Sequence, residues 1–197
     1  MKDLHIKDLD NNISFESLLG KLSSKLVNLP LESIDVAIES SLKLLVEFFD
    51  ADRCHLGEFS SDQSKIEVSY FYLRPDINIL HTTDVGEHYL PFVYESIKKD
   101  KLIAISKPSE LPDQAKQDCK AIDKLGIKSL LILPVKIESV VQFGFSLATT
   151  TKHIKWEEQT INRIMIAANI LANAIQRKMA LKQILNEKEW SEAVLQG

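Results

Sequence analysis

The most continuous apolar run of the chain lies in its middle, over residues 126–135, and carries no charge between Lys128 and the end of the run. A short apolar run that is rich in branched side chains is typical of a β-strand buried on both faces. A second apolar run, 140–148, follows after Glu138 and Ser139. The two runs therefore predict an antiparallel hairpin at the centre of a sheet.

Helical spacing of apolar residues marks both ends of the chain. Apolar positions three or four apart predict one helix over residues 13–28 and another over 31–49. Pro30 separates them, because the residue before a proline avoids the helical region. From Trp156 onward there is no proline, and no glycine before Gly197. This predicts one long C-terminal helix.

Shorter patterns fill the middle of the chain. They predict strands near 54–59, 66–73 and 102–105, helices over 90–99 and 113–124, and an irregular loop over 74–88. The regular alternation of strand and helix that marks a parallel sheet is missing. We therefore expect an α+β fold with an antiparallel sheet of about five or six strands. The terminal helices would cover one face, and short helices and loops would cover a pocket on the other.

Composition narrows the class of protein. The chain has 197 residues, of which 45% are hydrophobic and 26% charged, as in one globular domain. A net charge of -4 offers no basic surplus for binding nucleic acid directly. No segment resembles a signal peptide or a membrane span. Two cysteines without zinc-type spacing fit a reducing environment, so we expect a cytoplasmic protein.

Several strings occur in order along the chain: Leu22-Ser23 with residues 26–30, Ala51-Asp52-Arg53-Cys54, Leu90-Pro91-Phe92, Glu110-Leu111-Pro112 with Ala115 and Asp118, residues 126–134, and Trp156 with residues 172–174 and Arg177-Lys178. Together they resemble the GAF domain family, and in particular the GAF domains upstream of bacterial sensor histidine kinases and related regulators. Two positions depart from the pattern. The hairpin turn is Glu138-Ser139 where a glycine pair is common, and Phe92 stands where tryptophan is common.

The resemblance covers about residues 13–180. It divides the chain into a flexible N-terminus (1–12), a GAF domain (13–177) and the start of a signalling helix (178–197). It implies a non-catalytic sensory module of a signal-transduction protein, such as a two-component system. Such a module binds a small ligand or relays conformational change to an output domain later in the same polypeptide.

The resemblance also implies a pocket on the sheet face away from the terminal helices. The ligand is unspecified. Candidate lining residues come from the middle elements, and all of them could equally belong to the core: Phe71, Phe92, Val93, Leu111, Cys119 and Leu131.

The long C-terminal helix carries apolar residues seven positions apart, which is the spacing of a helix-pairing seam. We therefore expect a homodimer. The predicted interface residues are Ile161, Ile164, Ala168, Leu171 and Ile175. In the alternative, this face covers the sheet of its own subunit.

The cysteines raise an enzymatic alternative. Cys54 and His55 are adjacent on a strand, so their side chains point to opposite faces and cannot act as nucleophile and base. At the level of the fold, the chain also resembles free methionine sulfoxide reductases, which are GAF enzymes that use several cysteines. A further alternative is a pure dimerisation module with a filled pocket.

Cofactor sites are weakly indicated. Cys119 lies near the position where bilin-binding GAF domains attach their chromophore, but Lys120 follows it where histidine is usual. His81 or His88 could ligate haem iron, although solvated loop histidines are commoner. We therefore predict no cofactor, no metal and no catalytic residue.

Overall fold

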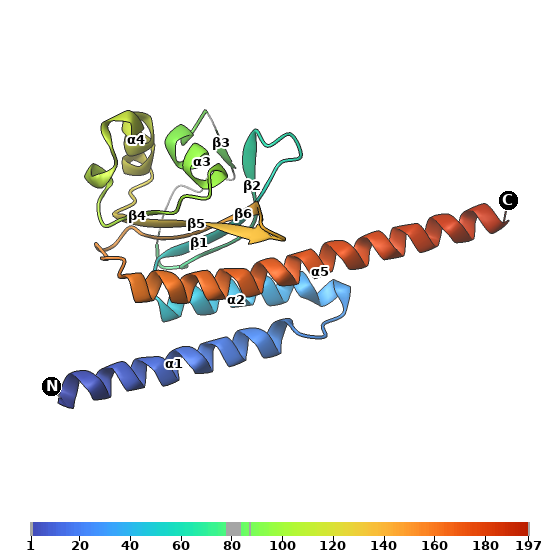
Figure 1. The fold of residues 1–197 in the computed structure, drawn as a ribbon, viewed down its shortest axis with the longest axis horizontal. Coiled ribbons are helices and arrows are strands. Elements are labelled where there is room, and N and C mark those ends of the chain that lie inside the picture. The colour runs from blue at the N-terminus through green and yellow to red at the C-terminus, as the bar shows by residue number, and fades with distance from the viewer. Residues whose placement is uncertain (1, 78–83, 87, 197) are drawn as a thin grey trace.

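The computed structural model describes residues 2–77, 84–86 and 88–196. One antiparallel sheet divides the molecule into two layers of helices (Figure 1). The helices α1, α2 and α5 lie on one face, and the shorter α3 and α4 lie on the other. This arrangement confirms the predicted α+β fold.

The sheet has six strands in the order β3-β2-β1-β6-β5-β4. Their bounds are β1 Arg53–Phe59, β2 Lys65–Leu73, β3 Asp84–Gly86, β4 Ile103–Ile105, β5 Ser129–Ile137 and β6 Val140–Thr149. The central pair β1 and β6 joins the N-terminal and C-terminal halves of the chain. β3 lies within the segment that the sequence predicted to be an irregular loop. The strand was not predicted because three residues are too few to show the alternation of a strand.

β5 and β6 form the predicted hairpin, in which Ile137 pairs with Val140. The two turn residues, Glu138 and Ser139, have φ angles of 48° and 71°. Positive φ at both central positions is typical of a type I′ turn, whose twist matches that of the strands. The departure from a glycine pair therefore leaves the hairpin in place.

The terminal helices have the bounds α1 Lys2–Leu26, α2 Ile34–Phe48 and α5 Glu158–Gln196, with a 3₁₀ turn over Leu31–Ser33 before α2. α2 and α5 lie against the sheet, and α1 lies outside them (Figure 1). α1 begins at Lys2 rather than near residue 13. No proline or glycine interrupts residues 2–19, so the predicted boundary does not appear as a break in the helix.

Two hydrophobic cores result, one on each face of the sheet. The larger core joins β1, β5 and β6 to the terminal helices; its fully buried members include Leu22, Leu42, Leu56, Leu133 and Leu171. The smaller core lies beneath α3 (Pro91–Lys98) and α4 (Lys116–Lys124).

α5 continues well past the edge of the sheet (Figure 1). Side chains 182–192 are all exposed, in contrast to the buried stripe nearer the start of the helix. Among the described residues, no helix combines the length and the apolar character that a membrane span requires.

Candidate functional site

Four of the predicted pocket residues lie among α3, α4 and the 3₁₀ turn Pro108–Glu110, which comes between the two helices in the chain. Val93 is fully buried in the smaller core, and Phe92 and Leu111 are half-buried against it. Cys119 is half-buried, and its thiol donates to the carbonyl oxygen of Pro108 at 3.6 Å. All four lie on the α3 and α4 side of the sheet, and their role as pocket lining stays a prediction.

The other two candidates lie on the sheet, on opposite faces. Phe71 on β2 faces the α3 and α4 side, where its ring stacks on that of His55 with centroids 6.4 Å apart. Its side chain is 47% exposed. Leu131 belongs instead to the core beneath the terminal helices. Side chains alternate along β5, and the even-numbered Leu130 and Ile132 point to the α3 and α4 side. Leu131 therefore does not line a pocket on that face.

Polar residues also lie on the α3 and α4 side of the sheet. Arg53 is buried next to Cys54, and this burial lowers the pKa of its guanidinium to about 10. Nearby on the same face, Nδ1 of His55 lies 3.4 Å from the hydroxyl of Ser146. Pockets for small molecules usually combine an apolar lining with a few such polar groups.

A buried acid that the sequence analysis did not include among the site residues holds α3 in place. Asp118 on α4 is fully buried, and its carboxylate accepts the backbone N–H groups of Phe92 and Val93 at 3.2 and 2.9 Å. These N–H groups lie in the first turn of α3, where a helix leaves its donors unsatisfied. Asp118 thus caps α3 from a neighbouring helix.

The predicted dimer seam is part of the monomer core. Ile164, Ala168 and Leu171 are fully buried within the single chain, Ile175 is nearly so, and Ile161 packs against the same core. The four buried side chains are covered by other parts of their own subunit, so they are not available to a second chain, and Ile161 is half-buried. Core and seam positions share nearly the same helical spacing, which explains the error.

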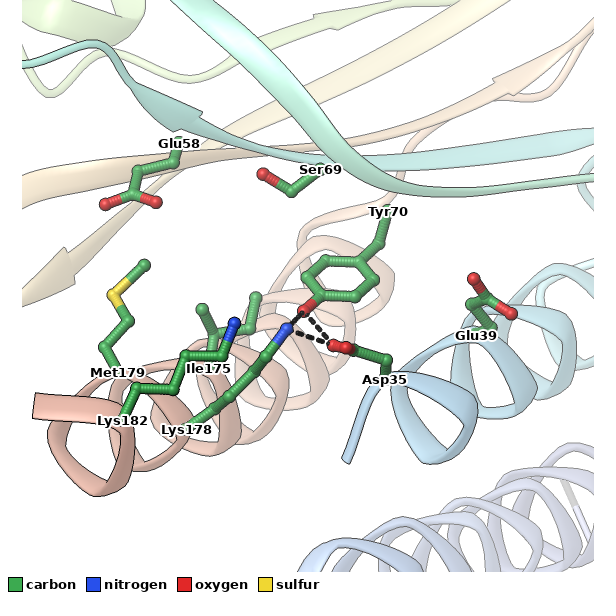
Figure 2. Close-up of a pocket in the computed structure, with 9 residues that line it drawn as sticks. All are labelled: Asp35, Glu39, Glu58, Ser69, Tyr70, Ile175, Lys178, Met179 and Lys182. Atoms are coloured by element: carbon green, nitrogen blue, oxygen red, sulfur yellow. Dashed lines mark hydrogen bonds and ion pairs between the residues drawn. The ribbon is translucent and has the colours of Figure 1, made fainter. Parts of the chain in front are cut away.

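A hollow of about 420 Å³ lies where α5 leaves the sheet (Figure 2). Its walls come from the start of α2, from β1 and β2, and from α5. The lining residues are Asp35, Glu39, Glu58, Ser69, Tyr70, Ile175, Lys178, Met179 and Lys182.

Three of these residues form a hydrogen-bonded group, which we call the exit cluster: Asp35, Tyr70 and Lys178. The Tyr70 hydroxyl donates to Oδ1 of Asp35 at 2.5 Å. The Lys178 ammonium group donates to the same oxygen and, at 3.0 Å, to the Tyr70 hydroxyl (Figure 2). It also lies 5.6 Å from the centre of the Tyr70 ring. The cluster therefore ties α5 to α2 and to β2.

Electrostatics favour the charged forms of the ion pair. The hydrogen bonds from Lys178 and Tyr70 lower the pKa of Asp35. Burial alone would lower the pKa of Lys178, but its bonds to Asp35 and Tyr70 outweigh this and raise it. Burial, together with the bond to Asp35, raises the pKa of Tyr70. Near neutral pH the cluster is thus a carboxylate, an ammonium and a neutral phenol.

A β-bulge places Ser69 and Tyr70 together at the hollow. Leu56 on β1 pairs with Tyr70, whereas the next residue, Gly57, pairs with Val68. The extra residue in β2 is Ser69, and such an insertion re-aims side chains. Because the cluster depends on this register and on three separate elements, no local sequence pattern predicts it.

Among the described residues, no group of three or more histidine, cysteine or acidic side chains could hold a metal ion. His81 lies outside the described residues. His88 is exposed, and its backbone carbonyl oxygen accepts a hydrogen bond from the Gln117 side chain at 2.6 Å.

Similar folds occur in solved structures. A phycoerythrobilin-bound GAF domain from a cyanobacterial phytochrome superposes with a TM-score of 0.69 and 14% identity, over 87% of this chain and 99% of that one. The GAF domain of an Acinetobacter phosphoenolpyruvate-protein phosphotransferase gives 0.61 and 11%, over 86% and 96%. The chain has the GAF fold.

An enzyme is also among the structures that share this GAF fold. Free methionine-R-sulfoxide reductase from Neisseria meningitidis, solved with its substrate, gives a TM-score of 0.65 and 10% identity, over 85% of this chain and 91% of that one. No protein-family model and no curated protein matches the sequence. At these identities the likeness concerns the fold alone.

Proposed function

We propose that this GAF domain is a regulatory module of a bacterial signal-transduction protein. It binds a small ligand, or receives a conformational change, on the α3 and α4 side of the sheet. It passes the change through α5 to an output domain later in the polypeptide, such as the kinase of a two-component system. Two free thiols agree with a cytoplasmic location.

The observation that carries this proposal is the path of α5. The helix is continuous from Glu158 to Gln196, and its buried stripe ends at Ile175. The remaining residues extend roughly 30 Å beyond that point at 1.5 Å per residue. A rigid helix that is anchored in a domain and exposed beyond it can transmit a small rotation or shift.

The exit cluster gives the ligand side a route to this helix. Phe71 and Tyr70 are adjacent on β2, so their side chains point to opposite faces of the sheet. Phe71 lies on the proposed ligand side, and Tyr70 bonds to Lys178 on α5. A ligand that displaces Phe71 would therefore also move the adjacent Tyr70, which contacts α5.

A chimera tests the proposal. Joining α5 at Gln196 to the core of a histidine kinase, in helical phase, should make kinase activity depend on the exit cluster. Lys178→Met removes both hydrogen bonds of the ammonium group, so we expect autophosphorylation to change several-fold. Lys188→Met is the matched control, because Lys188 is exposed beyond the cluster. Equal activity in the two variants would contradict the relay.

Sulfoxide reduction is the alternative that the Neisseria enzyme suggests. Reduction of a sulfoxide by two thiols transfers the sulfoxide oxygen to the first thiol as a sulfenic acid, and the second thiol then forms a disulfide with it and releases that oxygen as water. Cys54 is buried beneath the terminal helices, which raises the pKa of its thiol, whereas Cys119 lies on α4 across the sheet. The two thiols cannot meet, so we expect no turnover of free methionine sulfoxide in a reductant-coupled assay.

We also propose that the domain carries no resident chromophore. Purified protein should show neither a bilin band nor a haem Soret band. A stoichiometric Soret band that is lost in His88→Ala but kept in His153→Ala would overturn this expectation. A bilin that is bound covalently and lost in Cys119→Ser would overturn it as well.

A further inference from the structure

Two side chains of opposite charge face the hollow beside the exit cluster without an ion-pair partner. Glu58 on β1 and Lys182 on α5 both line it, and Figure 2 shows them entering from opposite walls. No ion pair joins either of them to another described residue, or the two to each other. The hollow therefore offers a carboxylate on one side and an ammonium group on the other.

The surroundings of Glu58 favour a cation in the hollow. Glu58 pairs directly with Glu67 across β1 and β2, and like charges in such a pair repel each other. Lys65 forms an ion pair with Glu67 at 2.9 Å, but no described cation does the same for Glu58. Burial, and then the charge of Glu67, raises the pKa of Glu58. A positive group beside Glu58 would offset both effects.

The opposite wall favours an anion. Lys182 lies one turn beyond Lys178, so the two lysines share the face of α5 that lines the hollow. The hydrogen bond from Lys178 is the largest cause of the lowered pKa of Asp35, and the charge of Lys182 also contributes. Lys178 already donates to Asp35 and Tyr70. Lys182 thus keeps its donors for an anion from outside the chain.

The same face of α5 gives the hollow an apolar wall. Ile175 and Met179 line it beside the two lysines, and Met179 is 39% exposed. A methionine side chain adapts to the shape of what it contacts. The volume of about 420 Å³ lies within the range of about 300–1,000 Å³ that is usual for small-molecule sites.

We propose that this hollow binds a free α-amino acid with an apolar side chain. The ammonium group of the ligand donates to Glu58, its carboxylate accepts from Lys182, and its side chain covers Met179. These three groups share one carbon atom in an α-amino acid, which suits walls that meet at one small hollow. An amine alone would leave Lys182 unpaired, and a carboxylate alone would be repelled by Glu58.

This site is separate from the ligand side of the proposed function. The hollow lies on the sheet face that the terminal helices cover, whereas the proposed function places its signal on the α3 and α4 side. Binding can be measured on the 197-residue chain without an output domain. A chimera that ignores Lys178 while the domain still binds the amino acid would refute the relay and leave this inference intact.

Calorimetric titration with L-leucine and two analogues tests the ligand class. In 4-methylpentanoate the ammonium group is missing, and in 3-methylbutylamine the carboxylate is missing. Each analogue loses one charge-assisted hydrogen bond, so we expect each to bind at least about ten-fold more weakly than leucine. No binding of leucine, or equal binding of either analogue, would overturn the proposal.

Substitutions on the two walls test the place of binding. Glu58→Gln and Lys182→Met should each weaken leucine binding by about ten-fold. Lys188→Met with Glu189→Gln is the matched control, because both side chains are exposed on the extension, and it should bind as the wild type does. Wild-type affinity in the Lys182→Met variant would overturn the proposal. This variant decides the matter if Glu58→Gln unfolds, because Lys182 is exposed.

Discussion

Position 57 on β1 requires a glycine, because β2 approaches it closely. A Cβ at this position would lie 2.7 Å from Cγ2 of Ile66 and 2.8 Å from the backbone oxygen of Glu67. The neighbouring strand cannot withdraw without disturbing the bulge that aims Tyr70. Gly57 on β1 thus allows the close pairing with β2 that places Tyr70 in the exit cluster.

We predict that Gly57→Ala lowers the free energy of unfolding by about 1–3 kcal/mol through overpacking. Gly20→Ala is the matched control in the middle of α1. Apart from the adjacent residues and the nearby backbone of α1 itself, no described atom lies within 4 Å of the position that its new methyl group would take, and the change should stabilise the helix by about 0.5–1 kcal/mol. Urea denaturation of both variants should show a lower free energy of unfolding for Gly57→Ala and a higher one for Gly20→Ala. Equal effects would mean that the strand contact is looser than described.

Asp52 fixes the loop between β6 and α5. Its carboxylate is fully buried and accepts hydrogen bonds from the backbone N–H groups and hydroxyls of Thr150 and Thr151 at 2.6–3.2 Å. Burial alone would raise the pKa of Asp52, but these four bonds outweigh it and lower the pKa. The carboxylate therefore favours the folded state while it is ionised.

This pKa shift predicts a pH dependence of stability. The contribution of Asp52 is present above the unfolded pKa of about 3.9, and it is lost as pH falls through the lower folded value. Asp52→Asn should cost roughly 1–3 kcal/mol at neutral pH. The difference between wild type and variant should shrink below about pH 4, as measured by urea unfolding at several pH values. A difference that stays constant with pH would contradict the assignment.

At the scale of elements, the exit cluster joins α2, β2 and α5 through one carboxylate, one phenol and one ammonium group. Asp35 is half exposed, so solvent screens its attraction to Lys178, and the pair contributes only modestly to stability. The importance of the cluster lies in where it holds α5, at the last point before the helix leaves the sheet.

Tyr70 offers a direct probe of the cluster. Its pKa is raised, so the neutral phenol favours the folded state up to the unfolded pKa of about 10, and that contribution is lost as pH rises through the higher folded value. The chain has four tyrosines. Tyr70→Phe should therefore remove a tyrosinate absorbance step centred above about pH 10. Loss of a step below that value would show that Tyr70 is not held as described.

The sequence predicted the elements well where a periodic pattern is long enough to be read. The central hairpin, α2 and the continuous α5 all follow from apolar spacing and from the positions of proline and glycine. β3 was missed because it has three residues. The exit cluster was missed because it forms only when Asp35, Tyr70 and Lys178, far apart in the chain, meet through the bulge in β2.

The seam on α5 shows a different limit. Residues such as Leu171 repeat at a spacing that suits both a sheet-covering face and a helix pair, and the sequence cannot say which surface claims them. The structure assigns Leu171 to the core of its own chain. Ile166 and Ile184 on the same helix stay on the surface instead.

At the scale of the molecule, that core assignment makes a prediction. Leu171→Ala should lower the free energy of unfolding by about 2–5 kcal/mol, because it leaves a cavity beneath the sheet. Ile184→Ala, on the exposed extension, should lower it by much less. Denaturation at a concentration low enough to keep both variants monomeric separates stability from association. Equal losses of unfolding free energy in the two variants would contradict the placement of Leu171 in the core.

The sheet connects the two helical layers, because each of its faces belongs to one of the two hydrophobic cores. The smaller core, with α3 capped by Asp118, holds the proposed ligand side. Phe71 and Tyr70 on β2 face opposite sides of the sheet, and we propose that α5, which extends beyond the sheet (Figure 1), carries the change outward. The central claim is that the exit cluster restrains the helix where it leaves the domain.

Hydrogen–deuterium exchange of the 197-residue chain tests that claim most directly. Lys178→Met should speed exchange of α5 amides beyond residue 178 at least several-fold and leave the β5–β6 hairpin protected. Lys188→Met, which alters an exposed lysine on the same helix, should match the wild type. Identical α5 protection in Lys178→Met and Lys188→Met would contradict the account.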